Sequence, residues 1–378
     1  MKQMKTESIV KQSLVAFALA GLTFGVVACG DDSSSSAPAE EPAVETSLTG
    51  VVFGSDYTTG ELRWIGKDGK ISKKSLEFYQ DSKVMANGGD LYVLERMGAD
   101  NISKVNPDKL ESDGKDAVVW QVALDGGANP VDMAFDKDNA WVALQNADSL
   151  VKISTKDGKI SKSIKVGKFA YEGETSPYVA DVEIKDGKLY VLMQRYTMDE
   201  NWVSTYPAGL LAIYDASTGD FKDTVQLKAK NPTAMAFLDG ELYVASLGEY
   251  NDSYGTDADD KRGIEKVNVK DGKSEFVVTG EKLGGGVYSF AADDGVAYVG
   301  AYKAWGDVPL MKVVIKDKKV EAIKDVADAE GSIAVNNGVV LVGDRSMGAE
   351  KVFKVVDGKA EALESPEGML APYSVVLF

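Results

Sequence analysis

A short strand motif recurs along this chain and restricts its fold more than any other feature. The motif is an aromatic or apolar residue followed by valine, shortly after a turn that contains Gly, Asp or Asn. Five clear copies are centred on Tyr92, Trp141, Tyr190, Tyr243 and Tyr298, and weaker copies occupy residues 50–53 and 338–342. From Tyr92 to Leu341 the copies lie 49, 49, 53, 55 and 43 residues apart. A period of this length built from short strands is typical of β-propeller blades.

Each repeat unit contains the pattern of four strands. In the fifth unit, the inner to outer strands are expected at residues 232–237, 242–246, 263–269 and 274–278. Asp-Gly pairs recur between such strands, as at Asp239-Gly240, and they favour tight hairpin turns because glycine adopts positive φ easily. No segment keeps a helical period. The sequence therefore predicts an all-β fold of four-stranded blades over residues 49–378, with seven blades of about 47 residues each. Six or eight blades are the alternatives.

The two ends of the repeat region predict that the ring is closed by the C-terminal strand. The first unit begins at its second strand, whereas residues 371–378 repeat the inner-strand pattern of residues 231–237. A C-terminal strand that completes the first blade would remove the exposed sheet edges.

The Leu-Tyr-Val strands and the Lys-Asp-Gly-Lys turns over residues 49–378 resemble bacterial propellers with Tyr-Val-Thr-Asn (YVTN) repeats. The Thr-Asn half of that motif is missing here, since Tyr92-Val93 is followed by Leu94-Glu95. The resemblance implies the propeller architecture. It implies little about activity, because this fold hosts enzymes as well as binding scaffolds.

The N-terminal segment has the pattern of a bacterial lipoprotein signal. Residues 1–28 contain three lysines, an apolar run and small residues before Cys29, which is the only cysteine of the chain. We expect residues 1–28 to be removed as a signal peptide and Cys29 to be lipidated. Residues 29–48, rich in Ser, Pro and Glu, would then form a flexible tether to the membrane. A spanning helix is the alternative, but the apolar run is shorter than the ~20 residues that it needs.

The amino-acid composition excludes several kinds of catalytic and metal site. The chain has no histidine, and lipidation would use its one thiol, so triads based on imidazole, cysteine nucleophiles and thiolate metal sites are excluded. The formal net charge is −17, and loss of residues 1–28, which carry three lysines and one glutamate, would take it to −19. Nucleic acid is therefore an unfavourable partner. Cations, neutral sugars and basic peptides are more favourable.

Three long insertions in consecutive units mark one face of the expected propeller as the functional one. They span residues 196–209, 249–263 and 302–309, whereas the opposite face receives short Asp-Gly turns. Aromatic and acidic residues in these loops and in the neighbouring entry loop suit stacking on sugars or anchoring of a peptide. The candidate ligand-binding residues are Tyr178, Tyr196, Trp202, Tyr206, Glu249, Tyr250, Tyr254, Tyr302 and Trp305. Packing of the loops against one another is the alternative role.

Two acidic groups are candidate cation sites. Alignment of the inner strands places Ser374, Lys83, Asp132, Asp181, Ala234, Ser289 and Ser332 at one level of the channel. There Asp132 and Asp181 could bind calcium with main-chain oxygens and water, or be satisfied by backbone amides or Lys83. A second cluster, including Asp252 and Asp257, has the oxygen density of a calcium loop but not the EF-hand spacing.

The sequence thus predicts a lipid-anchored binding protein of the bacterial cell envelope, facing the periplasm or the exterior. Its propeller face would bind a glycan, a peptide or an envelope protein without catalysis and without a required cofactor. A calcium-assisted hydrolase or lyase acting at the channel mouth, or an envelope-assembly scaffold, is the alternative function.

Overall fold

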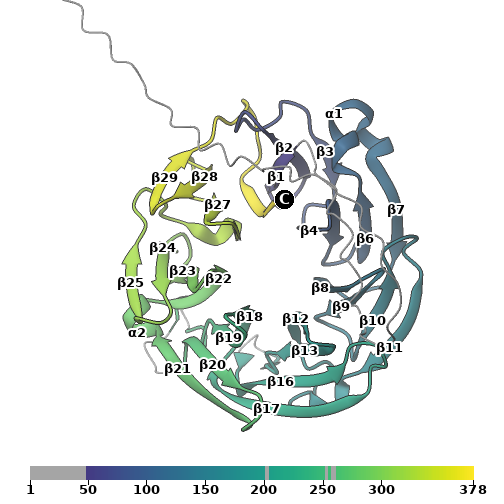
Figure 1. The fold of residues 1–378 in the computed structure, drawn as a ribbon, viewed down its shortest axis with the longest axis vertical. Coiled ribbons are helices and arrows are strands. Elements are labelled where there is room, and N and C mark those ends of the chain that lie inside the picture. The colour runs from purple at the N-terminus through teal and green to yellow at the C-terminus, as the bar shows by residue number, and fades with distance from the viewer. Residues whose placement is uncertain (1–47, 201–203, 252–253, 257–260) are drawn as a thin grey trace, which may run out of the picture. The chain divides into compact units, whose positions relative to one another are not determined.

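Seven four-stranded antiparallel sheets surround a central axis in the computed structural model, which describes residues 48–200, 204–251, 254–256 and 261–378 (Figure 1). The predicted all-β propeller with seven blades is confirmed. Cys29 and the expected tether lie outside the described residues, except for Leu48, which is the first residue of β1 and therefore belongs to the propeller. Within the described part of the chain, no helix is long and apolar enough to cross a bilayer.

The strands follow chain order from the inner to the outer edge of each blade, except in blade 1. Blade 1 contains β30 (Pro372–Leu377), β1 (Leu48–Ser55), β2 (Gly60–Gly66) and β3 (Leu76–Phe78). Blades 2 and 3 contain β4 (Ser82–Asn87), β5 (Asp90–Glu95), β6 (Asn101–Val105), β7 (Val118–Ala123), β8 (Pro130–Asp136), β9 (Asn139–Leu144), β10 (Ser149–Ser154) and β11 (Ile160–Lys165). Blades 4 and 5 contain β12 (Val179–Lys185), β13 (Lys188–Met193), β16 (Ala208–Asp215), β17 (Phe221–Lys230), β18 (Pro232–Leu238), β19 (Glu241–Ser246), β20 (Gly263–Asn268) and β21 (Lys273–Thr279). Blades 6 and 7 contain β22 (Gly286–Asp293), β23 (Val296–Tyr302), β24 (Leu310–Val314), β25 (Lys319–Ala322), β26 (Ile333–Asn336), β27 (Val339–Asp344), β28 (Lys351–Val356) and β29 (Lys359–Ala362).

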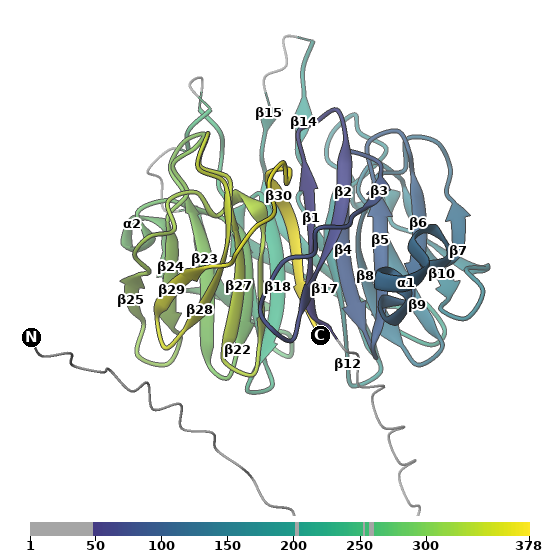
Figure 2. The same ribbon diagram turned by 90° about the horizontal axis from the view of Figure 1, so that it is seen from above.

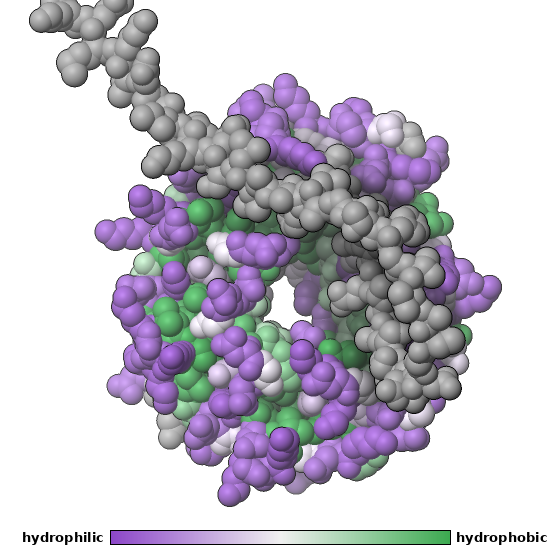
Figure 3. Space-filling model, in the orientation of Figure 1, coloured by the Kyte–Doolittle hydropathy of each residue, from purple (hydrophilic) through white to green (hydrophobic). Residues whose placement is uncertain are grey.

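A two-stranded hairpin and a few short helices complete the described elements. They are β14 (Thr197–Met198), β15 (Ser204–Thr205), α1 (Leu110–Asp113), α2 (Gly280–Leu283) and the 3₁₀ helices η1 (Pro107–Lys109), η2 (Gly114–Ala117), η3 (Gly167–Phe169) and η4 (Ala329–Gly331). The β14–β15 hairpin projects from one face of the ring (Figure 2). We call this side the loop face. Figure 3 views the opposite side, where both hydrophobic and hydrophilic residues border an open centre.

The Asp-Gly pairs form the hairpin turns that the sequence predicts. In the β18–β19 hairpin, Leu238 pairs with Glu241, so Asp239 and Gly240 are the two turn residues. Both have positive φ, 50° and 79°. This combination is the type I′ geometry, whose twist matches that of the flanking strands.

The aromatic residues of the repeat motif form the core between blades. Trp141, Tyr92, Tyr190, Tyr243 and Tyr298 are all buried. Tyr190 of blade 4 packs on Phe237 of blade 5, with ring centroids 5.1 Å apart, and it shares an apolar cluster with β18, β19 and β20. The motif therefore recurs because each blade must bury one face against the next, and the aromatic residue fills the space between them.

The C-terminal strand closes the ring. β30 pairs with β1 from Gly50–Leu377 to Gly54–Pro372, and it lies innermost in blade 1. The predicted closure is confirmed. The edges of β1 and β30 that face each other are therefore both paired, and no sheet edge is left open between them.

Candidate functional site

Seven hydrogen bonds join the inner strands, or in blade 7 the residues just before the inner strand, into a closed ring around the channel, one for each pair of adjacent blades. They span 2.6–3.1 Å and join Ser374 Oγ to Val84 N, Lys83 Nζ to Val131 O, Asp132 Oδ2 to Val182 N, Asp181 Oδ2 to Met235 N, Thr233 Oγ1 to Val287 O, Ser289 Oγ to Ala329 O and Ser332 Oγ to Val375 N. In every case the side chain belongs to one blade and the main-chain group to the next. We call this arrangement the hydrogen-bond ring.

The inner-strand alignment predicts these ring positions except in blade 5. There the ring residue is Thr233, whereas the alignment selected Ala234. The register of β18 against β19 shifts between Pro232 and Ala234, so Thr233 is an extra residue in the strand. An alanine side chain has no hydrogen-bonding group, and the extra residue supplies the hydroxyl instead.

The same irregularity occurs in five inner strands and aims side chains into the channel. The residues skipped by the pairing register are Tyr373, Val131, Ala180, Thr233 and Tyr288. All five line a cavity of 590 Å³ at the loop face. Neighbouring residues of a regular strand point to opposite faces, but a β-bulge re-aims one of them. Tyr288 and Ser289 therefore both line the cavity.

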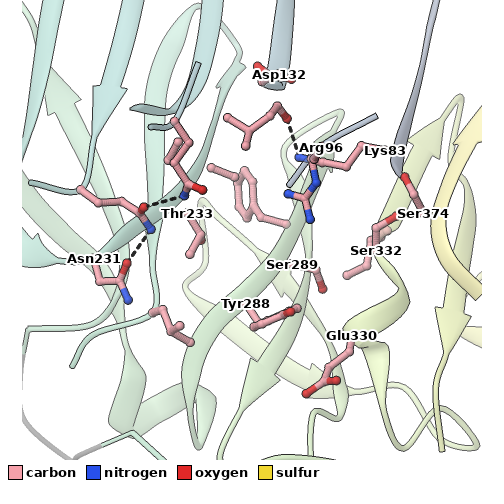
Figure 4. Close-up of a pocket in the computed structure, with 18 of the residues that line it drawn as sticks. Lys83, Arg96, Asp132, Asn231, Thr233, Tyr288, Ser289, Glu330, Ser332 and Ser374 are labelled. Carbon is pink, nitrogen blue, oxygen red and sulfur yellow. Dashed lines mark hydrogen bonds between the residues drawn. The ribbon is translucent and has the colours of Figure 1, made fainter. Parts of the chain in front are cut away.

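Tyrosines form much of the cavity wall. Those that line it are Tyr196, Tyr206, Tyr250, Tyr288 and Tyr373, from the loops and inner strands of blades 1, 4, 5 and 6. The remaining polar wall contains the amides Gln145, Gln194 and Asn231 and the charged residues Lys83, Arg96, Asp132 and Glu330. Figure 4 shows Arg96 beside Lys83 on one side of this cavity, and Tyr288 and Glu330 on the other.

Four side-chain amides form a ladder along blades 3, 4 and 5. Asn129 donates to Gln145 at 2.8 Å, Gln145 to Gln194 at 3.1 Å, and Gln194 to Asn231 at 2.6 Å. Asn231 in turn donates to the carbonyl of Gly248 at 3.1 Å. Each glutamine uses one N–H in the ladder and has a second one. The ladder fixes the orientation of these groups at the cavity wall before any ligand arrives.

Arg96 is held rigidly on the other side of the cavity. Its Nε and Nη2 donate to Asp81 Oδ1 at 2.8 and 2.6 Å, and Nη2 also donates to the hydroxyl of Tyr373 at 2.7 Å. The guanidinium of Arg345 lies over the rings of Tyr57 and Tyr373, 5.0 and 5.3 Å from their centroids. These contacts fix Tyr373 from both sides.

A second cavity of 460 Å³ adjoins the first and contains the acidic floor of the channel. Lys83, Asp132, Asp181 and Glu183 line it, and Lys83 and Asp132 also line the first cavity. Burial raises the pKa of Asp181 well above its usual range, and the charge of Asp132 and a hydrogen bond with it add to the shift. Burial, followed by the charge of Asp132, raises the pKa of Glu183 to about 8. Burial lowers the pKa of Lys83, although Asp132 opposes this shift.

The two aspartates predicted as cation ligands lie in the hydrogen-bond ring. Asp132 and Asp181 each accept a backbone amide of the next blade. Among the described residues, no three Asp, Glu, His or Cys side chains are grouped so that they could hold a metal ion. A cation at Asp132 and Asp181 would therefore need main-chain or water oxygens as further ligands. Asp252 and Asp257 lie outside the described residues.

The predicted aromatic residues take different positions on the loop face. Tyr196, Tyr206 and Tyr250 line the cavity, and Tyr178 stacks on Tyr196 with centroids 3.9 Å apart. Tyr302 is buried, with Tyr250 and Tyr288 5.8 and 5.6 Å from it. Tyr206 is also largely buried.

Three further predicted residues, Glu249, Tyr254 and Trp305, do not line the cavity. Glu249 forms an ion pair with Lys230. Tyr254 and Trp305 are exposed to 74% and 69%. Trp202 lies outside the described residues.

Several lining residues escape sequence reasoning. Tyr288 and Tyr373 directly precede the aligned ring positions Ser289 and Ser374, so strand alternation turns them away from the channel unless a bulge is present. Gln145 and Gln194 each follow the second strand of their blade by one residue. A glutamine at the same position in two adjacent blades is the one sequence signal that could have predicted the amide ladder.

The comparisons with known proteins show the fold alone. No protein-family profile matches the sequence, and no curated protein matches it. Apo AztD from Citrobacter koseri is similar in structure, with a TM-score of 0.53 and 12% identity over 88% of this chain and 98% of that one. The WD40 repeats of RRP9 give a TM-score of 0.55 with 10% identity over 86% and 88% of the two chains. A functionally unknown protein from Desulfotomaculum acetoxidans DSM 771 gives 0.51 with 13% identity over 88% and 99%.

Proposed function

We propose that this protein is a non-catalytic binding protein whose loop-face cavity holds a glycan or a peptide. The observation that carries the proposal is the combination of five tyrosines and an oriented amide ladder around a cavity of 590 Å³. This volume lies within the range of about 300 to 1,000 Å³ that is typical of ligand pockets.

The chemistry of the wall supports this ligand class. Tyrosine rings offer apolar faces that can stack on a sugar ring or on a flat side chain, together with hydroxyls at their edges. The spare N–H groups of Gln145 and Gln194 can donate to hydroxyls or carbonyls. A concave wall of this kind suits an inserted ligand better than the flat surface of a folded partner. An inserted loop of an envelope protein would meet the same chemistry as a peptide.

We further propose that Cys29 carries lipid and that residues 29–48 tether the propeller to a bacterial envelope membrane. The apolar run before Cys29 and the Ser-rich segment after it support this placement. A tethered propeller would meet its ligand in the periplasm or at the cell surface.

Glycan and peptide arrays probed with the full-length protein in detergent test the binding function. We expect the protein to bind particular glycans or peptides on the arrays. Its affinity for these array hits should fall about tenfold or more in Tyr250→Ala, because a central aromatic contact is lost. Phe221→Ala is the matched control, since Phe221 is a partly exposed aromatic on the outer strand β17, away from the cavity. Equal binding of every hit by wild type, Tyr250→Ala and Gln194→Ala would contradict the cavity assignment.

Binding of calcium by Asp132 and Asp181 remains a prediction, and it can be tested separately from ligand binding in the cavity. Thermal melting during a calcium titration should show a rise of the melting temperature in the wild-type protein, because a ligand that binds only the folded state stabilises it. Asp181→Asn keeps an oxygen for the amide of Met235 but cannot lose a proton to become a negatively charged calcium ligand, so the rise should shrink. A melting temperature independent of calcium would assign both carboxylates to the hydrogen-bond ring alone.

A further inference from the structure

Two tyrosines and one glutamate that line the loop-face cavity, together with a buried third tyrosine behind them, form a corner where blades 5, 6 and 7 meet. Tyr288 and Tyr302 are stacked, with centroids 5.6 Å apart and an interplanar angle of 21°. Tyr250 stands at 88° to Tyr302 at 5.8 Å. Glu330, in η4 before the inner strand of blade 7, lines the same cavity. We call Tyr250, Tyr288, Tyr302 and Glu330 the aromatic corner.

The rings of this corner are positioned by contacts that leave part of their surface open. The hydroxyl of Tyr302 donates to the carbonyl of Tyr254 at 2.6 Å, which fixes the central ring. Tyr250 and Tyr288 remain 38% and 39% exposed. Two ring surfaces at a large angle to each other therefore face the cavity beside a carboxylate.

No neighbouring cation neutralises Glu330 through an ion pair within the part of the chain that the structure describes. The backbone N–H of Gly306 lies close enough to its carboxylate to lower the pKa of Glu330 slightly, against the effect of burial. Arg345 lies nearby, but its guanidinium donates to the carbonyls of Ala371, Pro372 and Ser55 and covers the ring of Tyr57. The charge of Glu330 is thus available to a ligand.

We propose that the aromatic corner binds an organic ammonium group carried by the ligand, an inference that rests on the proposed binding function of this cavity. A cation is attracted to the faces of tyrosine rings, more strongly when it is partly removed from water. A carboxylate beside the rings adds direct charge attraction. The net charge of −17 favours the approach of cations to this surface.

The surroundings of Glu330 predict a pH dependence of ligand binding, which is a second way to test the proposal. Burial raises the pKa of Glu330 to about 7, the charge of Asp328 adds to the shift, and Arg345 and the Gly306 amide oppose it. The phenols of Tyr250, Tyr288 and Tyr302 also face this carboxylate, and burial raises the pKa of each of them, so they stay neutral near pH 7. Affinity for a permanent cation should therefore be higher at pH 8 than at pH 6.

A pair of isosteric probes tests the proposal on the full-length protein. Choline carries a quaternary ammonium, and 3,3-dimethylbutan-1-ol has the same shape without the charge. In ligand-observed NMR titrations, we expect choline to bind about tenfold or more tightly than its neutral analogue, and its affinity to rise from pH 6 to pH 8. Nα-acetyl-lysine amide, the second cationic probe, shows whether a primary ammonium of the peptide type is preferred.

Substitutions distinguish the contribution of the aromatic corner to binding from that of the rest of the cavity. Glu330→Gln should weaken choline binding about tenfold and remove its pH dependence, whereas Tyr288→Phe, which keeps the ring, should change it little. Glu361→Gln, on the outer strand β29, is the control for the loss of one negative charge. Equal binding of choline and its neutral analogue, no binding of either, or an unchanged Glu330→Gln variant would overturn the proposal. The broader binding function would still stand if an array hit is lost in Tyr196→Ala, on the far wall of the cavity.

Discussion

The hydroxyl oxygen of Ser374 accepts the backbone N–H of Val84 at 3.1 Å, although 290 positions separate the two residues in the chain. This bond joins the C-terminal strand to the inner strand of blade 2 and belongs to the hydrogen-bond ring. Blade 1 therefore depends on both ends of the repeat region, and its integrity reports on closure of the propeller.

Loss of the Ser374 hydroxyl should destabilise the protein. Ser374→Ala leaves the amide of Val84 without its acceptor in a buried place, which costs about 1–3 kcal/mol of the free energy of unfolding. Urea denaturation measures the difference. Ser163→Ala, on the exposed outer strand β11, is the matched control and should stay within about 0.5 kcal/mol of wild type. Deletion of residues 371–378 should have a larger effect and broaden the transition. Unchanged unfolding after that deletion would contradict closure by β30.

Stability should fall as the pH rises because of Glu183. The pKa of this carboxyl is raised from 4.5 to about 8 in the folded chain, so between these values the folded state holds a proton that the unfolded state has lost. The free energy of unfolding contributed by Glu183 is therefore full below about pH 4.5 and is lost as the pH passes about 8. Melting temperatures from pH 5 to pH 9 should decline more steeply in wild type than in Glu183→Gln. Glu275→Gln, exposed on β21, should follow the wild-type curve.

Truncation of different tyrosines should separate binding from stability. Tyr206 and Tyr302 are 7% and 4% exposed, so their replacement by alanine removes packed rings and should cost about 3–5 kcal/mol of stability. Trp305 is 69% exposed, and Trp305→Ala should leave the melting temperature nearly unchanged. If Trp305 contacts the ligand, its loss should weaken binding by about 1–3 kcal/mol. A large loss of stability in Trp305→Ala would show that its ring packs the loops.

Cys29→Ser should release the protein from membranes without changing its fold. The acyl chains would supply the membrane affinity, and the propeller begins only at residue 48. Fractionation into membrane pellet and supernatant measures the effect, and circular dichroism of the released protein serves as the control. Recovery of the variant in the pellet would count against the lipid anchor.

The sequence predicted the architecture well because propeller blades repeat the same packing solution. The aromatic residue of each second strand must fill the space between two blades, as Trp141 and Tyr190 do, and this requirement leaves a visible period. Closure by residues 371–378 followed from the same regularity. Tight Asp-Gly turns such as Asp239-Gly240 are readable because their backbone conformation demands particular residues.

The candidate site was predicted only in part because it depends on departures from that regularity. A β-bulge has no sequence signature of its own, so Tyr288 and Tyr373 could not be assigned to the cavity and Thr233 was displaced by Ala234 in the alignment. Loop composition did indicate Tyr196, Tyr206 and Tyr250, which line the cavity. It could not distinguish these from Tyr302, because burial within a loop cluster is a tertiary property.

The position of β1 also determines how the protein would respond to a mechanical load. β1 is bonded along its length to β2 on one side and to β30 on the other, both antiparallel. A pull on the chain before residue 48 along the strand axis would strain both ladders at once in shear, instead of opening them one bond at a time. A force applied at the N-terminal end of the propeller would therefore load first a strand that is hydrogen-bonded along both of its edges.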